Sequence, residues 1–238
     1  MKLTVNRKGL LRTSAVILIA IAIWNYPCHY RMGINGEVSE KEIPLYAKAC
    51  GFLYRDWAYK DIVRNILATG AKSDTEKAVA ILKWTHENVT GRIPEGIKVV
   101  DDHPLNIIIR QYGTGDQIED VFTILCSYAG MRAGMAKCYD RDSPAFKIFS
   151  VVQIDGRWLI FIAGENMYFL NKEGRIGSVE DYLNGDIVLS DEARAEYSMF
   201  LDGLKDARLS SLTRADEQMP LRRIPTELKK AFTRGRVK

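Results

Sequence analysis

The spacing of apolar residues predicts a short buried helix near the middle of the chain, between residues 112 and 135. Apolar positions recur there every three or four residues, as on one face of a helix. These positions are Ile118, Val121, Phe122, Leu125 and Ala129. Thr114 or Asp116 can cap the first amides, and Gly130 ends the run. The rest of the predicted fold is organised around this helix.

Strand-like patterns follow this helix. Met131–Tyr139 and Phe146–Ile154 have such patterns and flank a polar loop. Asp155-Gly156 is a tight-turn signal that leads into a third strand, Arg157–Ala163. Met167–Leu170 gives a short fourth strand. These patterns predict a small antiparallel sheet.

Helical patterns occupy the two flanks of this region. Ser39–Ala68 predicts helix in two pieces, with Pro44 near the start, and Ser73–Val89 opens with a Ser-x-x-Glu capping box. Ser178–Leu183 and Ser190–Leu204 predict two shorter helices. The sequence therefore indicates an α+β fold, with helices packed on a small antiparallel sheet.

Motifs in this region follow a recognisable order. Gly113-Thr114-Gly115-Asp116 precedes the central helix, and Asp155-Gly156-Arg157-Trp158 joins two predicted strands. Upstream, the helix that opens at Ser73 carries Trp84 near its end. In this order the motifs resemble the transglutaminase-like superfamily, over roughly residues 73–170. The resemblance implies a papain-like core in which a cysteine at the start of the central helix is the nucleophile.

The resemblance places unsuitable residues at the family's three catalytic positions. The cysteine position is Gln117, the histidine position is Lys147, and the aspartate position falls at Ile162 or Ala163. A carboxamide has no nucleophilic atom, and lysine shuttles no proton at neutral pH unless its pKa is lowered. An aliphatic side chain cannot orient an imidazole. The resemblance therefore implies a domain without the Cys-His-Asp triad, and we favour a pseudoenzyme over an enzyme.

The four cysteines offer no evident replacement for the nucleophile. Cys126 falls on the apolar side of the central helix and is expected to be a core thiol. Cys138 lies in a predicted strand, Cys50 has no identifiable partner, and Cys28 ends an N-terminal apolar run. We expect structural roles and no disulfide framework.

The three histidines are also better explained by structure than by chemistry. His86 lies near the carboxyl end of a predicted helix, where the helix dipole accounts for it, and His29 follows the N-terminal apolar run. His103 stands in Asp101-Asp102-His103-Pro104. Adjacent residues on one loop give poor metal geometry without distant ligands, so we favour a capped turn before Pro104. We expect no metal and no cofactor.

Residues 1–30 form a segment that is first basic and then apolar. Four basic residues precede an uncharged stretch, of which Ala15–Trp24 is entirely apolar. A cleaved signal peptide is one interpretation. No small-residue cleavage site follows, so we favour an uncleaved membrane anchor from about Leu10 to Cys28. The charge bias predicts a single-pass membrane protein with a cytoplasmic N-terminus and an extracytoplasmic domain, periplasmic in a bacterium.

The last part of the chain, residues 208–238, is strongly basic. It carries nine Lys or Arg against three acidic residues, a net charge of +6, whereas the whole chain carries +4. Such a tail could bind an anionic membrane face or an acidic partner, or remain a solvated extension. It has no recognisable nucleic-acid-binding motif, so no nucleic acid is expected. The predicted organisation is an anchor (1–30), an α+β domain (31–207) and this tail.

These observations favour a membrane-anchored, catalytically inactive transglutaminase-like domain that acts as a binding or accessory protein at the cell envelope. Its partner would be a protein, peptide or glycan held in the former substrate cleft. The cleft would be lined by Tyr112, Asp116, Gln117, Lys147 and Trp158. Two alternatives stay open: a cysteine-dependent amide hydrolase or acyl transferase with a displaced active site, and a structural spacer that binds through its basic tail.

Overall fold

The computed structural model describes most of the chain. The described ranges are 7–34, 37–68, 70–97, 102–140, 143–206 and 218–223. The chain divides into two units, Met1–Tyr54 and Arg55–Lys238, and helix α2 (Leu45–Leu67) runs from the first into the second. Most of the predicted basic tail, 208–238, lies outside the described residues.

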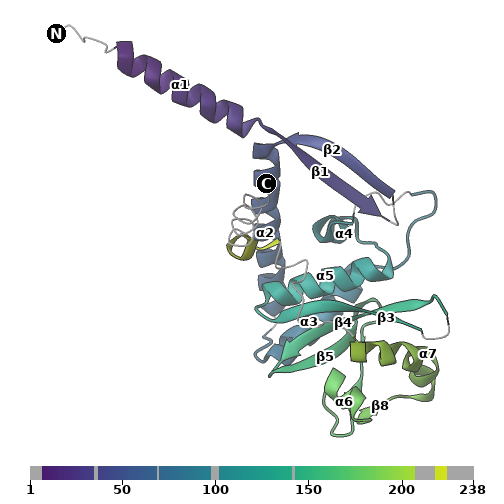
Figure 1. Ribbon diagram of the computed structural model, residues 1–238. Coiled ribbons are helices and arrows are strands. Elements are labelled where there is room, and N and C mark those ends of the chain that lie inside the picture. Colours follow the sequence, from purple (N-terminus) through teal and green to yellow (C-terminus); the bar gives the residue numbers. More distant parts are fainter. Residues whose placement is uncertain are drawn as a thin grey trace, which may run out of the picture. The chain divides into compact units, whose positions relative to one another are not determined.

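The first unit consists of a helix and a hairpin that precede α2 (Figure 1). Helix α1 spans Arg7–Trp24. Strands β1 (Pro27–Ile34) and β2 (Glu37–Pro44) pair antiparallel, with Pro27 opposite Pro44. Within the described ranges, no helix combines the length and the apolar character that a membrane crossing requires.

Two predicted boundaries in this unit are wrong. The predicted anchor helix continues to Cys28, but α1 ends at Trp24 and Cys28 lies in β1. Pro27 has no backbone amide donor, so it cannot continue the helical hydrogen bonds. The predicted helix from Ser39 is also wrong, because the residues up to Pro44 form β2 and α2 begins only after them. Proline disfavours helical backbone at the residue before it.

The second unit is built on a four-stranded antiparallel sheet. Its strands β3 (Arg132–Tyr139), β4 (Phe146–Ile154), β5 (Arg157–Ile162) and β6 (Met167–Tyr168) lie in the order β3-β4-β5-β6. The three long strands agree with their predicted ranges to within one residue. In the predicted Asp155-Gly156 turn both residues have positive φ angles, 52° and 80°, as a tight hairpin turn requires.

Helices lie on both sides of this sheet (Figure 1). Helices α3 (Asp74–Asn88), α4 (Pro104–Arg110) and α5 (Gly115–Tyr128) pack together, and α5 packs against β3 and β4. Helices α6 (Val179–Leu183) and α7 (Asp191–Leu201) lie on the other side. Helices packed on a small antiparallel sheet confirm the predicted α+β class.

Short elements complete the second unit. The 3-10 helix η1 (Ala163–Glu165) follows β5, and η2 (Asp202–Asp206) follows α7. Strands β7 (Leu170–Asn171) and β8 (Ile187–Val188) form a separate pair. The predicted strand Met167–Leu170 is therefore divided between β6 and β7.

Capping boxes start α3, where one is predicted, and α6. At α3, the Ser73 hydroxyl accepts a hydrogen bond from the Glu76 amide (3.2 Å), and the Glu76 carboxylate accepts one from the Ser73 amide (3.0 Å). Ser178 and Asp181 make the same reciprocal pair at α6. Each box satisfies amides that a helix leaves without partners, so local sequence was sufficient to place these helix starts.

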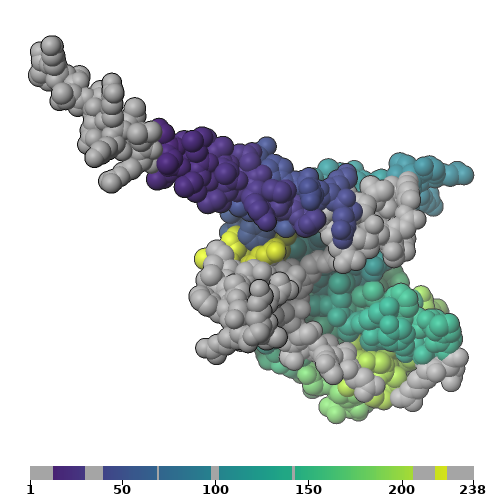
Figure 2. Space-filling model, turned by 45° about the horizontal axis from the view of Figure 1, so that its top comes forward, coloured from purple at the N-terminus to yellow at the C-terminus, as the bar shows by residue number. Residues whose placement is uncertain are grey.

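The sheet separates two apolar clusters. Neighbouring residues of a strand point to opposite faces, so the position in the strand decides the cluster to which a side chain belongs. The strand residues on the α5 side are Ala133, Val152, Ile154, Leu159 and Phe161. Those on the α7 side are Ala136, Cys138, Phe149, Val151, Ile160 and Ile162. In Figure 2 the teal atoms of the β3–β4 region lie against green atoms of the C-terminal elements, in agreement with the contacts of β3 with α7 and η2.

Helix η2 packs closely on β3 at Gly203. A Cβ atom at this position would lie 2.9 Å from the Cβ atom and 3.0 Å from the Cα atom of Cys138. We expect Gly203→Ala to lower the free energy of unfolding by about 1–3 kcal/mol, because the paired backbone of β3 cannot move aside freely. Denaturant unfolding followed by circular dichroism measures the change. Gly115→Ala is the control, since a Cβ atom there has no neighbour within 4 Å; an equal loss in both variants would contradict the close contact.

Candidate functional site

Gln117, at the predicted cysteine position, is held at the start of α5. The residue is only 5% exposed. Its Oε1 atom accepts hydrogen bonds from Nη2 of Arg110 (2.8 Å) and from the backbone amide of Thr114 (3.1 Å). The guanidinium of Arg110 also lies 5.4 Å from the ring centre of Tyr112. The carboxamide joins α4 to α5 and does not open into a cleft.

Three of the predicted cleft residues are brought together here. Asp116 directly precedes Gln117 in the first turn of α5, and its Oδ1 atom accepts a hydrogen bond from the hydroxyl of Thr114 (2.5 Å). The carbonyl of Tyr112 accepts a hydrogen bond from Nε of Arg110 (2.8 Å). These three residues thus lie around the start of α5. The partners in their hydrogen bonds are Arg110 and Thr114.

The other predicted positions, Lys147, Trp158 and Ile162, lie on the opposite face of the sheet. Lys147 Nζ is 2.6 Å from Oε1 of Glu196 on α7 and 3.9 Å from the ring centre of Tyr197. Trp158 and Ile162 pack with the apolar cluster on the α7 side. The sheet separates these side chains from α5, so the five predicted residues do not line one cleft.

The alternation of side chains along β4 is the reason for this correction. The predicted histidine position, Lys147, pairs with Cys138, which belongs to the cluster on the α7 side. The β4 side chains that reach the α5 side come from Ser150, Val152 and Ile154. A shift of one residue in the alignment therefore places the predicted histidine position on the wrong face of the sheet.

A buried polar cluster lies where α5, β4 and η1 meet. Glu119 of α5 is 3% exposed, and Ser150 of β4 is fully buried. Oε2 of Glu119 lies 2.5 Å from the hydroxyl oxygen of Ser150. Oε1 accepts hydrogen bonds from the backbone amides of Ala163 (2.7 Å) and Gly164 (3.1 Å). We call these four residues the Glu119 junction.

The carboxyl group of Glu119 has partners in both protonation states. Burial raises its pKa to about 7, although the hydrogen bonds from Ser150 and the two amides lower it. In the ionised state it accepts all three of these hydrogen bonds. In the neutral state Oε2 can donate to the Ser150 hydroxyl, which can in turn donate to the Glu119 carbonyl oxygen, 3.4 Å away. The enclosed carboxyl group thus connects α5, β4 and η1.

The thiols of this unit lie in apolar surroundings. Cys126 and Cys138 are fully buried. Burial raises the pKa of Cys126 well above its usual range and that of Cys138 to about 12. The thiolate is the nucleophilic form, so neither group is activated. The predicted core position of Cys126 is confirmed.

His86 contacts a residue of the Glu119 junction. It is an exposed residue of α3, and its Nδ1 atom lies 3.1 Å from the carbonyl oxygen of Gly164. This contact connects α3 to η1. The imidazole therefore helps to fix the same short helix that the Glu119 carboxyl holds.

His103 has a structural role at the start of α4. Its Nδ1 atom accepts a hydrogen bond from an amide of the first turn (3.3 Å), which confirms the predicted capped turn before Pro104. The Tyr59 hydroxyl lies 3.4 Å from the same nitrogen, and Oε1 of Gln218 lies 3.1 Å from Nε2.

The described ranges hold no group of three or more His, Cys, Asp or Glu placed to bind a metal ion. Asp101, considered above as a ligand, lies outside them.

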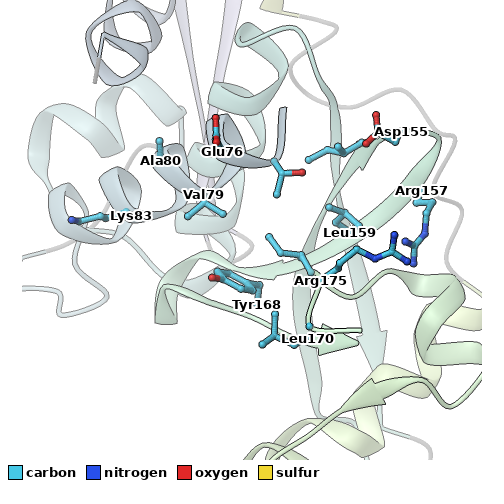
Figure 3. Close-up of a pocket in the computed structure, with 14 residues that line it drawn as sticks. Glu76, Val79, Ala80, Lys83, Asp155, Arg157, Leu159, Tyr168, Leu170 and Arg175 are labelled. Carbon is cyan, nitrogen blue, oxygen red and sulfur yellow. The ribbon is translucent and has the colours of Figure 1, made fainter. Parts of the chain in front are cut away.

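A pocket of about 670 Å³ lies between α3, the β4–β5 turn and the β6–β7 region (Figure 3). Its walls are largely apolar and include Val79 and Ala80 of α3, Leu159 of β5 and Tyr168 of β6. The predicted cleft residues are not among those that line it. The second unit thus offers a cavity for a ligand at a place that the sequence motifs did not indicate.

Glu119 and Ser150 were missed by reasoning from the sequence. Ser150 is a polar residue at an inward position of β4, followed two residues later by the buried Val152. Glu119 stands beside Ile118 in a helix that is buried along its whole length from Gln117 to Ser127. The available signal in the sequence is a hydroxyl residue in a predicted strand and an acidic residue in the predicted central helix. Their pairing depends on the tertiary contact between α5 and β4.

Comparison with known proteins gives only distant likenesses. No family model and no curated protein matches the chain. A candidate cysteine protease from Cytophaga hutchinsonii has 16% identity and a TM-score of 0.40, over 60% of this chain and 45% of that protein. A candidate protease from Parabacteroides distasonis has 14% identity and a TM-score of 0.36, over 57% and 35%. A TGase has 11% identity and a TM-score of 0.39, over 84% and 54%. This chain spans from about a third to about half of each of these proteins, and likenesses this weak carry no functional conclusion.

The raised pKa of Glu119 makes the stability of the protein depend on pH. The ordinary pKa of a glutamate is 4.5, whereas that of folded Glu119 is about 7. Between these values the folded chain binds more protons than the unfolded chain, so the free energy of unfolding falls as the pH rises from 4.5 to 7. The loss is about 3 kcal/mol at most.

The variant Glu119→Gln keeps the hydrogen bonds of the junction but cannot ionise. Its amide oxygen can accept from the backbone of Ala163 and Gly164, and its amide nitrogen can donate to Ser150. We expect the fall in stability to disappear and the variant to be more stable than the wild type above pH 7. Denaturant unfolding at a series of pH values measures this, and titrating groups that the two proteins share cancel in the comparison. Parallel pH profiles for the two proteins would contradict the buried carboxyl.

Proposed function

We propose that the second unit is a catalytically inactive, transglutaminase-like domain of papain-like fold that acts as a binding or accessory protein. The Glu119 junction is the observation that carries this proposal. A papain-like enzyme needs an accessible thiolate beside an imidazole where its central helix meets the sheet. The resemblance places Gln117 at the cysteine position, and two residues further along α5 a carboxyl group meets a hydroxyl of the sheet, both enclosed.

The order of elements supports the proposed fold family. The capped helix α3 precedes the central helix α5, and strands β3 to β5 follow, with the Asp155-Gly156 turn leading to Trp158. The same order of motifs carries the resemblance over residues 73–170. The proposal therefore rests on the chain's own motifs and their spatial arrangement.

We extend the proposal to a membrane-anchored protein at the cell envelope. Helix α1 exposes large apolar side chains, among them Val16 and Leu18, each 66% exposed, and basic residues precede them in the sequence. Apolar side chains next to basic residues favour contact with an anionic membrane surface. The basic residues before the helix favour a cytoplasmic N-terminus for such an anchor, which would leave the second unit extracytoplasmic, or periplasmic in a bacterium. Its partner would be a protein, peptide or glycan.

No contact among the described residues favours either of the two alternative functions. An enzyme with a displaced active site requires a cysteine beside a histidine. The described contact of His86 is with the backbone of Gly164, and Cys126 lies in the apolar cluster on the α5 side. A spacer that binds through its tail depends on residues that lie mostly outside the described ranges.

Thiol reactivity tests the proposed inactivity directly. We expect Cys126 and Cys138 of the native full-length protein to resist iodoacetamide at pH 7, because both thiols are buried and have raised pKa values. Mass spectrometry after proteolysis measures the modification of each cysteine over time.

The same protein in denaturant is the control, and there all four cysteines should react at the rate of a free thiol. Cys50, which is exposed in the native protein, reports that the reagent is active under native conditions. Rapid modification of Cys126 or Cys138 in the native protein, faster than in the denatured one, would indicate an activated nucleophile and overturn the proposal.

A further inference from the structure

The pocket beside α3 combines an apolar interior with cationic groups at one end. Val79 and Ala80 form one wall, and Leu159, Tyr168 and Ile176 form the other. Its volume of about 670 Å³ lies within the range of about 300–1,000 Å³ that is usual for small-ligand sites. An apolar chain or ring placed here would lose its contact with water, which favours binding.

Two arginines lie at one end, and Arg175 already pairs with Glu173. In Figure 3 the side chains of Arg157 and Arg175 extend toward each other beside Leu159. Nη2 of Arg157 donates to the hydroxyl of Ser178 (3.0 Å) and pairs with Asp181, so its guanidinium is held in position. In the described part of the chain the bonds of Arg157 use only this nitrogen, which leaves its other N–H groups for a ligand.

Two acidic residues, Glu76 and Asp155, also line the pocket, and they differ in how far they can balance the charge of the arginines. The Glu76 carboxylate accepts hydrogen bonds from the backbone amides of Lys72 (2.7 Å) and Ser73 (3.0 Å), so its charge is balanced by the start of α3. Asp155 lies in the β4–β5 turn at the edge of the pocket. Lys83 of α3 lies at the other end of the pocket (Figure 3) and pairs with Glu87 (3.8 Å), so it adds no charge beside the arginines. The N–H groups of Arg157 and Arg175 that their carboxylate partners leave unused can donate to the oxygens of an anionic ligand group.

We propose that this pocket binds a single-chain amphipathic carboxylate. Its apolar chain would lie between α3 and the strands β5 and β6, and its carboxylate would face Arg157 and Arg175. Planar guanidinium groups suit a carboxylate because two parallel N–H groups can meet its two oxygens. The inference deepens the proposed binding role by naming a ligand class, and it also holds if the domain proves to be catalytic.

Calorimetric titration of the full-length protein with decanoate tests the proposal. We expect saturable binding of one decanoate per chain. Octanoate should bind roughly tenfold more weakly, because two methylene groups are no longer buried. Decan-1-ol and decyltrimethylammonium have the same chain without the negative charge, and both should bind more weakly than decanoate.

Variants locate the site. Ala80→Phe fills the pocket from α3 and should abolish binding, and Thr75→Trp, which fills it from the edge, serves if the first variant does not fold. Arg175→Gln should weaken decanoate binding by roughly fivefold while leaving decan-1-ol unaffected. Lys172→Gln is the matched control, because it also removes one exposed cation of an ion pair but lies outside the pocket lining.

Each outcome decides the proposal. Absence of saturable decanoate binding, or equal binding to wild type and to both filled variants, would overturn it. Equal affinity for decanoate and decan-1-ol, or equal losses in Arg175→Gln and Lys172→Gln, would overturn the carboxylate part. Thiol reactivity is measured separately, so failure of the ligand proposal and failure of the proposed inactivity give different results.

Discussion

The buried carboxyl group of Glu119 joins three elements that are distant in the sequence. Helix α5 supplies the carboxyl, β4 the hydroxyl of Ser150, and η1 the amides of Ala163 and Gly164. A buried carboxyl group without partners costs several kcal/mol, so α5 can lie against the sheet only if these partners are in place. One interaction therefore holds α5, β4 and η1 together in the fold.

Much of the second unit could be predicted because its signals are local. The capping boxes, the Asp155-Gly156 turn and the three- and four-residue spacing in α5 each depend on residues close together in the chain. The hairpin of β1 and β2 was missed because its polar residues resemble a helix start, and Pro44 was taken to lie inside the helix that it precedes. Local patterns thus placed most elements but not every boundary.

The candidate site could not be predicted in the same way. Which face of β4 meets α5 is a tertiary property, and a difference of one residue exchanges the two faces. Lys147 is predicted to line a cleft with Gln117, but it contacts Glu196 and Tyr197 on α7. Charged residues are rarely buried without a partner, and the partner of Glu119 lies 31 residues away in the chain. The sequence contains both groups but not the contact that pairs them.

The Glu119 junction and the pocket beside α3 are separate parts of the second unit. The junction lies between α5 and the sheet, whereas the pocket lies between α3 and the β5–β6 region. The lining of the pocket and the hydrogen bonds of the junction share no residue. The most direct test of the account is a carbon-13 NMR titration of the Glu119 side-chain carboxyl in the full-length protein, with the signal assigned by its absence in Glu119→Gln. The account predicts a midpoint near pH 7. A midpoint near 4.5, the ordinary value for a glutamate, would show that the group reaches water and would contradict a closed junction.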